Sequence, residues 1–254
     1  LVKNGSKEII LLGQNVNAYN FEGLRLSNLI LEIEKIPGVE RIRYTTSHPK
    51  DMTDDLIEVY KTSKKLMPLV HLPVQSGSDK VLKLMNRKHT VKKYLNILNK
   101  LKKINPEIRF SSDFIIAYPG ENENDFKNTL KLIEEIKFIN SFSFIFSPRP
   151  GTVAADLPTI DKKDSLKRLE VVQEKLSNNQ LSVNRSLERT TQNVLVENRM
   201  NDKTKLFGRS EHMTSVLFSG SDDLIGKIVK VKILSSNQNN LFGEVIDQSN
   251  QKVA

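Results

Sequence analysis

The chain has 254 residues and a formal net charge of +9; 38% of its residues are hydrophobic and 27% are charged. This balance excludes a disordered chain, and no apolar run reaches the roughly 20 residues that a membrane-spanning helix needs. Cysteine is absent, which excludes disulfides and cysteine-ligated metal sites within these residues and makes the cytoplasm the expected compartment. The first residues contain neither an initiator Met nor a signal peptide, so we expect part of a longer protein.

The positive charge is concentrated between Lys61 and Arg109. Thirteen Lys and Arg residues in this segment face only two acids, Asp79 and Glu107, which gives 13 − 2 = +11. A focused basic field favours a polyanion such as RNA. Solvated helix faces in a protein from an AT-rich genome explain the same composition, and the charge pattern alone does not choose between the two.

Strand-like apolar runs alternate with amphipathic segments of helical length through the first 150 residues. In chain order the pattern predicts strands at 8–12, 41–45, around 70, 109–116 and 142–146, and helices at 27–35, 53–63, after 78, at 90–104 and at 125–136. Thr53 and Ser78 stand where helix N-caps are expected. Successive βα units require a parallel sheet, open or closed, with helices on the outside.

The pattern changes after Pro158. A long polar helix is predicted from Lys163 to about Arg189, with one apolar side made of Leu166, Leu169, Val172, Leu176 and Leu181. From Thr191 onward, turn residues separate five short strands, at 194–197, 206–209, 216–218, 227–234 and 241–246, which predicts a small antiparallel OB-like β-barrel. We therefore expect an α/β protein with a partial parallel (β/α) barrel at 1–160, a connecting helix at 161–190 and a small barrel at 191–254.

A polar turn follows each predicted parallel strand. The turns are Gly13-Gln14-Asn15, Ser47-His48, Gln75-Ser76, Tyr118-Pro119-Gly120 and Arg149-Pro150-Gly151. Ligands of parallel sheets bind at the carboxyl ends of the strands, so these loops predict one common site. In the segment from His71 to Asp79 a strand turns into a helix start, where free N–H groups could hold an anion; an ordinary βα turn explains the same spacing.

The motifs occur in a recognisable order. They are the segments Glu8 to Tyr19, Arg43 to Pro49, His71 to Arg87, Asp113 to Glu121 and Ser147 to Ala155, and Val194 to Glu244 follows them. This series resembles the strand motifs and the closing TRAM module of the MiaB-type tRNA methylthiotransferases, which are radical S-adenosylmethionine (SAM) enzymes. The resemblance covers nearly the whole chain, with a large departure in the absence of cysteine and a smaller one at Ala117, where the family usually has Gly.

The resemblance implies a demanding chemistry. In that family a reduced 4Fe-4S cluster held by three cysteines cleaves SAM to a 5′-deoxyadenosyl radical, and a second 4Fe-4S cluster on an N-terminal domain carries the sulfur. The implied product is 2-methylthio-N6-dimethylallyladenosine at tRNA position 37, and the implied partners are tRNA and an electron donor, with the enzyme a monomer. Because thiolates ligate such clusters, the cluster motif would lie before Leu1, and we expect this chain alone to be inactive.

The resemblance also implies a set of cofactor-binding residues. They are Gly13, Gln14, Asn15, His71, Gln75, Ser76, Arg87, Asp113, Pro119 and Gly120. Gln14 and Asn15 would reach the methionine moiety of SAM, and Pro119 and Gly120 the adenine. Arg87 would bind the carboxylate, because a guanidinium fork matches two carboxylate oxygens. Judged from the residues alone, Arg87 could instead be a cation at a helix C-terminus, and Glu121 could equally be an acid at a helix start.

Two arginines are candidate RNA contacts. Arg149 follows the fifth strand and Arg209 lies in the second barrel strand; each could equally be an unpartnered surface residue. The segment 191–254 has 8 Lys and Arg against 7 Asp and Glu, so we expect it to add modest RNA affinity without base choice, with the segment 61–109 supplying much of the attraction.

No metal site is expected in this chain. The four histidines, His48, His71, His89 and His212, lack the close spacing of zinc ligands, although His48 and His71 follow strands that lead into the expected site. Two other classes stay open. One is a phosphate-binding (β/α)-barrel enzyme such as an aldolase-like lyase, for which neither a catalytic Lys nor a Gly-rich phosphate loop is evident. The other is a non-catalytic RNA-binding protein on the same scaffold.

Overall fold

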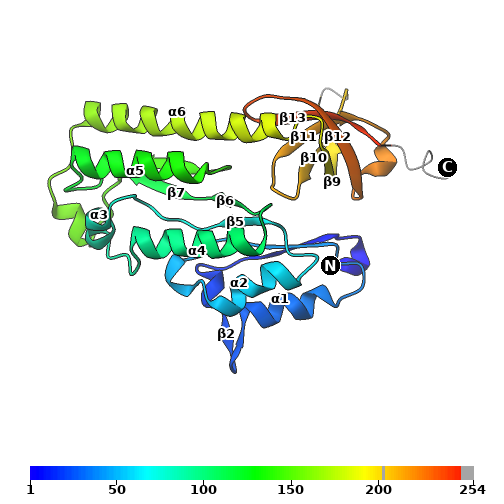
Figure 1. The fold of residues 1–254 in the computed structure, drawn as a ribbon, viewed down its shortest axis with the longest axis horizontal. Helices are drawn as coiled ribbons and strands as arrows, with labels where there is room; N and C mark the ends of the chain where they lie inside the picture. Colours follow the sequence, from blue (N-terminus) through cyan, green and yellow to red (C-terminus); the bar gives the residue numbers. More distant parts are fainter. Residues whose placement is uncertain (202–203, 247–254) are drawn as a thin grey trace.

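The computed structural model describes residues 1–201 and 204–246, and its first half is an open parallel sheet (Figure 1). The strands are β1 (Glu8–Leu11), β4 (Arg41–Tyr44), β5 (Leu69–His71), β6 (Arg109–Ser111), β7 (Asp113–Ile116) and β8 (Phe142–Ile145). Parallel pairs join β1 to β4, β5 to β6 and β7 to β8, and parallel bridges Ile42–Leu66 and Gln75–Phe114 link those pairs. The predicted parallel partial barrel is confirmed, with β6 and β7 as the two halves of the predicted strand 109–116.

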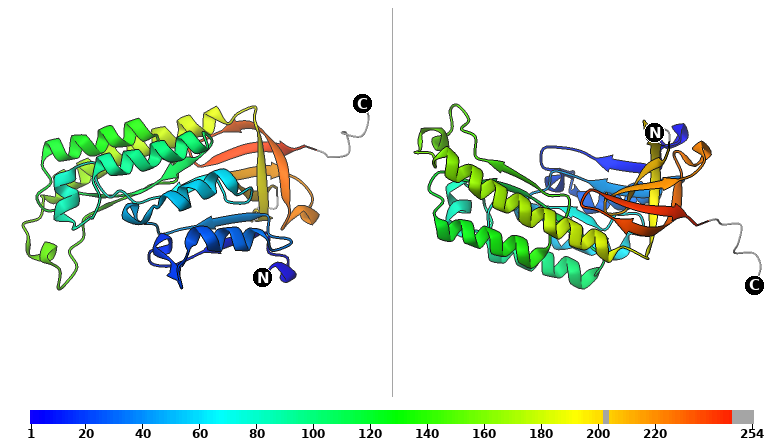
Figure 2. Two further views of the ribbon diagram at one scale, coloured as in Figure 1. Left: turned by 60° about the horizontal axis from the view of Figure 1, so that its bottom comes forward. Right: turned by 90° about the horizontal axis from the view of Figure 1, so that it is seen from above.

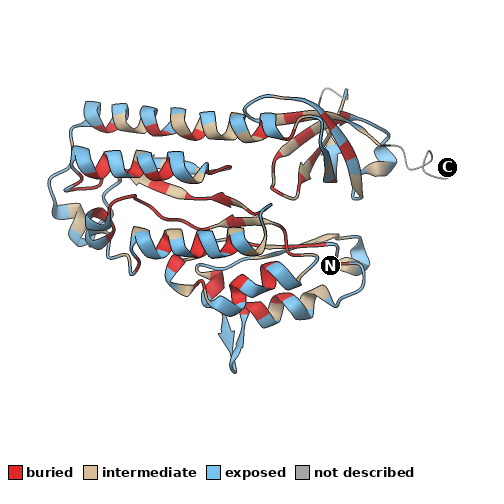
Figure 3. Cartoon of the chain, viewed as in Figure 1, coloured by how far each residue is buried: buried red, intermediate tan, exposed pale blue. Residues whose placement is uncertain are grey.

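Five helices bury one face of this sheet. They are α1 (Leu26–Glu34), α2 (Asp54–Thr62), α3 (Asp79–Leu84), α4 (Val91–Ile104) and α5 (Glu123–Ile136), and the sides that they turn inward are buried (Figure 3). Successive strand residues alternate between the two faces. Ile42, Phe114 and Ile116 are fully buried under the helices. Phe142 and Phe144 point to the opposite face and are 58% and 54% exposed, so that face is open.

The two predicted helix caps differ. Ser78 caps α3 as predicted, because its Oγ accepts a hydrogen bond from the backbone N–H of Val81 at 3.4 Å. Thr53 occupies the N-cap position of α2, but its side chain accepts no hydrogen bond from the helix backbone. Two acids in the first turn, Asp54 and Asp55, stabilise the start of the helix instead, because their negative charges interact favourably with the positive end of the helix dipole.

Short elements complete the first half. A hairpin of β2 (Asn20–Phe21) and β3 (Leu24–Arg25) projects from the body beside α1 (Figure 1). Single 3-10 turns are η1 (Val2–Asn4), η2 (Val16–Ala18), η3 (Pro49–Asp51) and η4 (Val153–Asp156).

The long helix α6 (Lys162–Ser186) packs along α5 and β8 and leads to the second barrel (Figure 2). Val172 and Leu176 are buried, as predicted for its apolar side. Leu166 does not belong to that side and is 43% exposed. Ser165 takes the inward position one residue earlier, and its hydroxyl bonds the carbonyl of Asp161 at 2.9 Å.

The second half closes into a five-stranded barrel. Its strands are β9 (Thr191–Arg199), β10 (Leu206–Ser210), β11 (Ser215–Ser219), β12 (Ile228–Ser236) and β13 (Asn240–Val245), with η5 (Asp222–Leu224) between them. The order around the barrel is β10-β11-β13-β12-β9. The predicted small OB-like barrel is confirmed, and one of its pairings, β11 with β13, runs parallel while the others are antiparallel. Five strands in a closed ring cannot alternate in direction all the way round. Residues 247–254 of the predicted 191–254 segment lie outside the described residues.

The barrel contacts the amino-terminal end of the sheet. Arg41, the first residue of β4, donates from Nη1 to the carbonyl of Arg209 at 3.0 Å and from Nη2 to that of Asn193 at 2.7 Å. Nε2 of His212 lies 2.9 Å from the carbonyl oxygen of Glu107, just before β6. The small barrel therefore covers the end of the sheet opposite the predicted site. Among the described residues, no helix is long and apolar enough to cross a membrane.

Candidate cofactor site at the carboxyl ends of the strands

The loop after β1 carries Asn15, whose side-chain amide oxygen has no hydrogen-bond partner among the described residues. Asn15 is partly buried and donates from Nδ2 to Oδ2 of Asp51 at 2.7 Å. Its Oδ1 is buried without a hydrogen-bond partner in the described part of the chain. Gly13 and Gln14 lie exposed on the same exit. A buried carbonyl oxygen without a donor is costly, and a ligand N–H would satisfy it.

The predicted His71, the last residue of β5, and Asp113, the first residue of β7, lie side by side. Nδ1 of His71 lies 2.6 Å from Oγ of Ser111, and Nε2 lies 3.6 Å from Oδ2 of Asp113. Gln75 continues the strand pairing: its backbone N–H donates to the carbonyl of Asp113 at 3.0 Å. Its side chain starts from a backbone with φ of 74°, an uncommon conformation for a residue other than Gly.

Arg87 is a half-buried cation without a close partner. Its guanidinium makes no hydrogen bond or ion pair with any residue that the structure describes. Burial lowers the pKa of Arg87, and the nearby carboxylate of Asp113 raises it in part. The charge of Arg87 in turn helps to lower the pKa of His48, after burial as the main cause. Arg87 therefore lies near the carboxylate of Asp113 and keeps donors free for an anion.

His89 joins this group and was not predicted. It is 5% exposed, neither ring nitrogen makes a hydrogen bond to a described residue, and its ring meets that of His48 edge-on at 5.5 Å. Burial, then the charges of His48 and Arg87, lowers the pKa of His89 to about 4, with a smaller opposite contribution from the backbone of Val74. The imidazole is therefore neutral at pH 7. The connection from α3 to α4 is polar, with Asn86, Arg87 and Lys88 before His89, so no signal in the local sequence marked this residue.

The Gln-Ser-Gly-Ser turn is packed against α5. Ser76 is fully buried and its Oγ lies 3.4 Å from Oγ1 of Thr129, which also accepts from the N–H of Gly77 at 2.9 Å. A Cβ on Gly77 would lie 2.5 Å from the carbonyl oxygen of Asn128, so only Gly fits there. The hydroxyl of the predicted Ser76 is thus engaged by the protein, which fixes the turn that carries Gln75.

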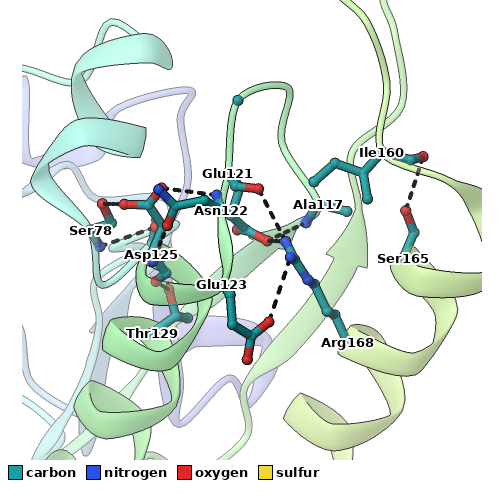
Figure 4. Close-up of polar contacts among 12 residues, drawn as sticks. Ser78, Ala117, Glu121, Asn122, Glu123, Asp125, Thr129, Ile160, Ser165 and Arg168 are labelled. Atoms are coloured by element: carbon teal, nitrogen blue, oxygen red, sulfur yellow. Dashed lines mark hydrogen bonds and ion pairs between the residues drawn. The ribbon is translucent and has the colours of Figure 1, made fainter.

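The turn after β7 is tied to α6 by a buried ion pair (Figure 4). Oε1 of Glu121 accepts from Nη1 of Arg168 at 2.7 Å and from the N–H of Ala117 at 3.1 Å. The side chain of Glu121 has no exposed surface, and burial raises its pKa although Arg168 opposes the shift. The acid stands before the N-cap Asn122 and holds the turn rather than starting the helix.

The same turn contains the predicted Pro119 and Gly120. Pro119 is buried, and the carbonyl of Gly120 accepts from Nζ of Lys80 at 2.8 Å. Ala117 has φ of 58°, the left-handed conformation that Gly adopts without cost. The Ala in this chain therefore holds a strained backbone where the related motif has Gly.

Comparison with known families decides the class of this fold. The model of the radical SAM superfamily matches residues 1–133, and that of the TRAM domain matches residues 185–246. The chain belongs to the radical SAM superfamily. Both the expected radical SAM domain and the expected TRAM module are confirmed.

Individual relatives of this radical SAM chain carry one name. It is 66% identical to the tRNA-2-methylthio-N(6)-dimethylallyladenosine synthase of Pelagibacter ubique, over 100% of this chain and 58% of that protein. The synthases of the same name from Ruegeria sp. and Wolbachia pipientis are 46% and 49% identical, over 97% and 96% of this chain and 57% of each relative. The chain thus spans under two thirds of the length of these relatives.

The donor set of this radical SAM chain suits SAM and does not suit an iron–sulfur cluster. The unpaired Arg87 guanidinium and the free Asn15 oxygen match the carboxylate and the ammonium group of an amino acid. A cluster needs thiolates, and the sequence has no Cys. Within residues 1–201 and 204–246, no group of three His, Cys, Asp or Glu could hold a metal ion.

The two predicted RNA contacts lie at opposite ends of the sheet. Arg149 is exposed in the loop after β8. Arg209 lies in the TRAM barrel at the other end of the sheet, where its Nη1 donates to the carbonyl of Met213 at 3.1 Å and its guanidinium lies 5.2 Å from the ring of Phe207. The structure therefore does not bring these two arginines together.

Proposed function

We propose that this chain is the SAM-binding and tRNA-binding part of a methylthiotransferase that forms 2-methylthio-N6-dimethylallyladenosine at tRNA position 37. The supporting observation is the 66% identity over the whole chain to a synthase of that name. The TRAM domain supports an RNA substrate. The whole enzyme that we propose is a cytoplasmic monomer that uses two 4Fe-4S clusters and an electron donor.

In this proposal the polar group at the strand ends holds SAM. Arg87 binds the carboxylate, Asn15 accepts from the ammonium group, and Gln14 lies on the same exit to reach the methionine moiety. When bound, SAM supplies the transferable methyl group and the one-electron chemistry of the superfamily. No step through a cluster is assigned to these residues, because they include no thiolate.

The remaining polar residues orient the ligand. The predicted Gln75, Pro119 and Gly120 place backbone and side-chain atoms around the ribose and adenine. His71 is held between Ser111 and Asp113, so its ring has one fixed orientation. Fixed donors of this kind lower the entropy cost of binding a flexible cofactor.

A chimeric enzyme tests the proposal. The matched part of the Pelagibacter ubique synthase is replaced by this chain, and the product is reconstituted anaerobically with SAM, reductant and tRNA that carries N6-dimethylallyladenosine. Mass spectrometry of the nucleosides should show the methylthio derivative. A chimera that binds tRNA and SAM with full cluster content but gives no methylthio product would contradict the proposal and favour a non-catalytic RNA-binding protein.

A further inference from the structure

Two aromatic rings stand exposed on the open face of the sheet. Phe142 and Phe144 of β8 are 58% and 54% exposed, their planes are 18° from parallel, and their centroids lie 6.5 Å apart. Residues two apart on a strand are separated by about 6.6 Å, so the two rings follow one another along β8 on one face of the sheet.

A cavity of about 430 Å³ opens beside these rings. Three segments that are distant in sequence form it: β8, the middle of α6 with Gln173 and Ser177, and the turn between β12 and β13 with Gln238 and Asn239. None of the lining residues that the structure describes is ionisable. A phosphate or an acidic peptide would need a cation here, so the lining favours a neutral ligand with a polar edge.

The walls of this cavity are held in place by hydrogen bonds. Asn184 is fully buried and donates from Nδ2 to the carbonyls of Asn237 and Gln238, at 2.8 Å and 3.1 Å. Nε2 of Gln238 donates to Oγ of Ser177 at 2.6 Å. The TRAM turn is therefore fixed against α6 before any ligand arrives, which reduces the entropy cost of binding.

Two amides of the cavity remain available to a ligand. The side chains of Gln173 and Asn239 are exposed and make no hydrogen bond to the described residues. An amide offers both a donor and an acceptor, the combination that reads the edge of a nucleobase. Exposed aromatic rings beside such amides are the usual means of holding unpaired bases.

The strand register connects this cavity with the cofactor site. Phe142 pairs with Asp113 and Phe144 with Ile115, so the two rings lie on the same face as the Asp113 carboxylate. We propose that Phe142 and Phe144, with Gln173 and Asn239, form a binding platform for one unpaired base of the RNA substrate. The inference rests on the proposed function and names the part of the RNA that the chain holds beside the cofactor site.

Fluorescence of a labelled RNA tests the platform. The 254-residue chain is titrated into a short single-stranded RNA with one 2-aminopurine, whose emission falls when the base stacks. Phe144→Ala and Phe144→Leu should each weaken binding about tenfold, the range for one stacked base. Phe21→Ala is the matched control, because Phe21 is 57% exposed on the distant β2–β3 hairpin; it should bind as the unaltered chain does.

The Phe144→Leu variant distinguishes aromatic stacking from simple hydrophobic contact. Wild-type affinity in Phe144→Leu would mean that the ring contributes no stacking, and the platform would be refuted. If the variants lose their folded circular dichroism, the unaltered chain decides the question through a photocrosslink from 5-iodouridine RNA. A crosslink within 141–146 supports the platform, and crosslinks confined to other segments, or none, overturn it. Neither assay needs methylthiolation, so failure of the platform proposal can be distinguished from failure of the proposed function.

Discussion

Arg87 is a cation that the protein half-buries without giving it a hydrogen-bonding partner. Burying a charged group without a partner costs folding free energy, and a bound anion would compensate that cost. In the reconstituted chimera, Arg87→Ala should weaken SAM binding by about 1.5–3 kcal/mol, the value of a hydrogen bond to a charged group. The tRNA affinity should hardly change, and isothermal titration calorimetry measures both.

Two variants control the Arg87 experiment. Lys88→Ala removes an exposed neighbouring cation and should leave the SAM affinity unchanged. Arg87→Lys keeps the charge but loses the planar fork, so its SAM affinity should lie between that of the unaltered chimera and that of the Arg87→Ala variant. Equal SAM affinity in all of these proteins would return Arg87 to the role of a cation near the end of α3.

The buried His89 predicts a pH dependence of stability. Its pKa is lowered from 6.5 to about 4 in the folded chain, where His48, Arg87 and Lys93 face it. The unfolded chain therefore takes up a proton first as the pH falls from 6.5 towards 4, and stability present above pH 6.5 is lost in that window. Between pH 7 and pH 5 the loss from this residue should be about 2 kcal/mol.

Urea unfolding of the chain and of His89→Gln at both pH values measures this contribution. Gln cannot be protonated, so the variant should lose about 2 kcal/mol less than the unaltered chain between pH 7 and pH 5. The pKa of His212 is also lowered and acts equally in both proteins. Identical pH profiles would show that His89 is not held neutral by its surroundings.

Part of this polar group could be predicted from the sequence. His71 lies 3.6 Å from Asp113 and Arg87 lies near that carboxylate, because strand order and loop position determine where these residues lie. The hydroxyl of Ser76 faces α5, an orientation that depends on how closely Gly77 approaches that helix. His89 was missed because its pKa depends mainly on burial, and the residues next to it in the sequence do not show that it is buried.

At the scale of elements, one ion pair joins α6 to the turn after β7 (Figure 4). Arg168→Ala would leave the fully buried Glu121 without its cation, and breaking such a pair costs about 3–5 kcal/mol. Chemical denaturation should show that loss in Arg168→Ala. The double variant Arg168→Ala with Glu121→Gln should recover part of it, because a neutral amide can still accept from the N–H of Ala117.

Lys167→Ala is the control on the same helix, since Lys167 is exposed. It should change stability by less than about 0.5 kcal/mol. If Arg168→Ala is no more damaging than Lys167→Ala, the ion pair does not hold α6 in place.

The elements themselves were largely predictable, and their pairing was not. The strand and helix segments follow the hydrophobic period, so each predicted element of the first half is present within a few residues. The parallel pairing of β11 with β13 depends on ring closure, which no local pattern carries. Arg41 contacts barrel residues that lie 152 and 168 positions further along the chain, and no periodic pattern in the sequence predicts contacts over such a separation.

For the whole molecule, the TRAM barrel and the candidate cofactor site lie at opposite ends of one sheet, and Phe142 and Phe144 stand on β8 beside the TRAM turn. The basic segment 61–109 includes α3 and α4, where lysines such as Lys92, Lys93 and Lys103 are exposed on the outer side. Much of that charge therefore lies on the helical side of the sheet, away from the open face. Measuring the RNA affinity over a series of salt concentrations would show how many of these positive charges contribute to RNA binding.

The chain alone should not support the radical chemistry. After anaerobic reconstitution with iron and sulfide it should show no cluster absorption and form no 5′-deoxyadenosine from SAM, because it offers no thiolate to iron. The chimera with the relative's remaining residues is the positive control. A stoichiometric cluster on the 254-residue chain would contradict this prediction.

A crystal structure of the reconstituted chimera with SAM tests the proposal that SAM binds at the carboxyl ends of the parallel strands. We predict electron density for SAM at the exits of β1, β4, β5 and β7, with its carboxylate within hydrogen-bond distance of Arg87 and its adenine beside Pro119 and Gly120. Density for SAM at any other place, or a SAM molecule at these exits that touches neither Arg87 nor Asn15, would contradict the account.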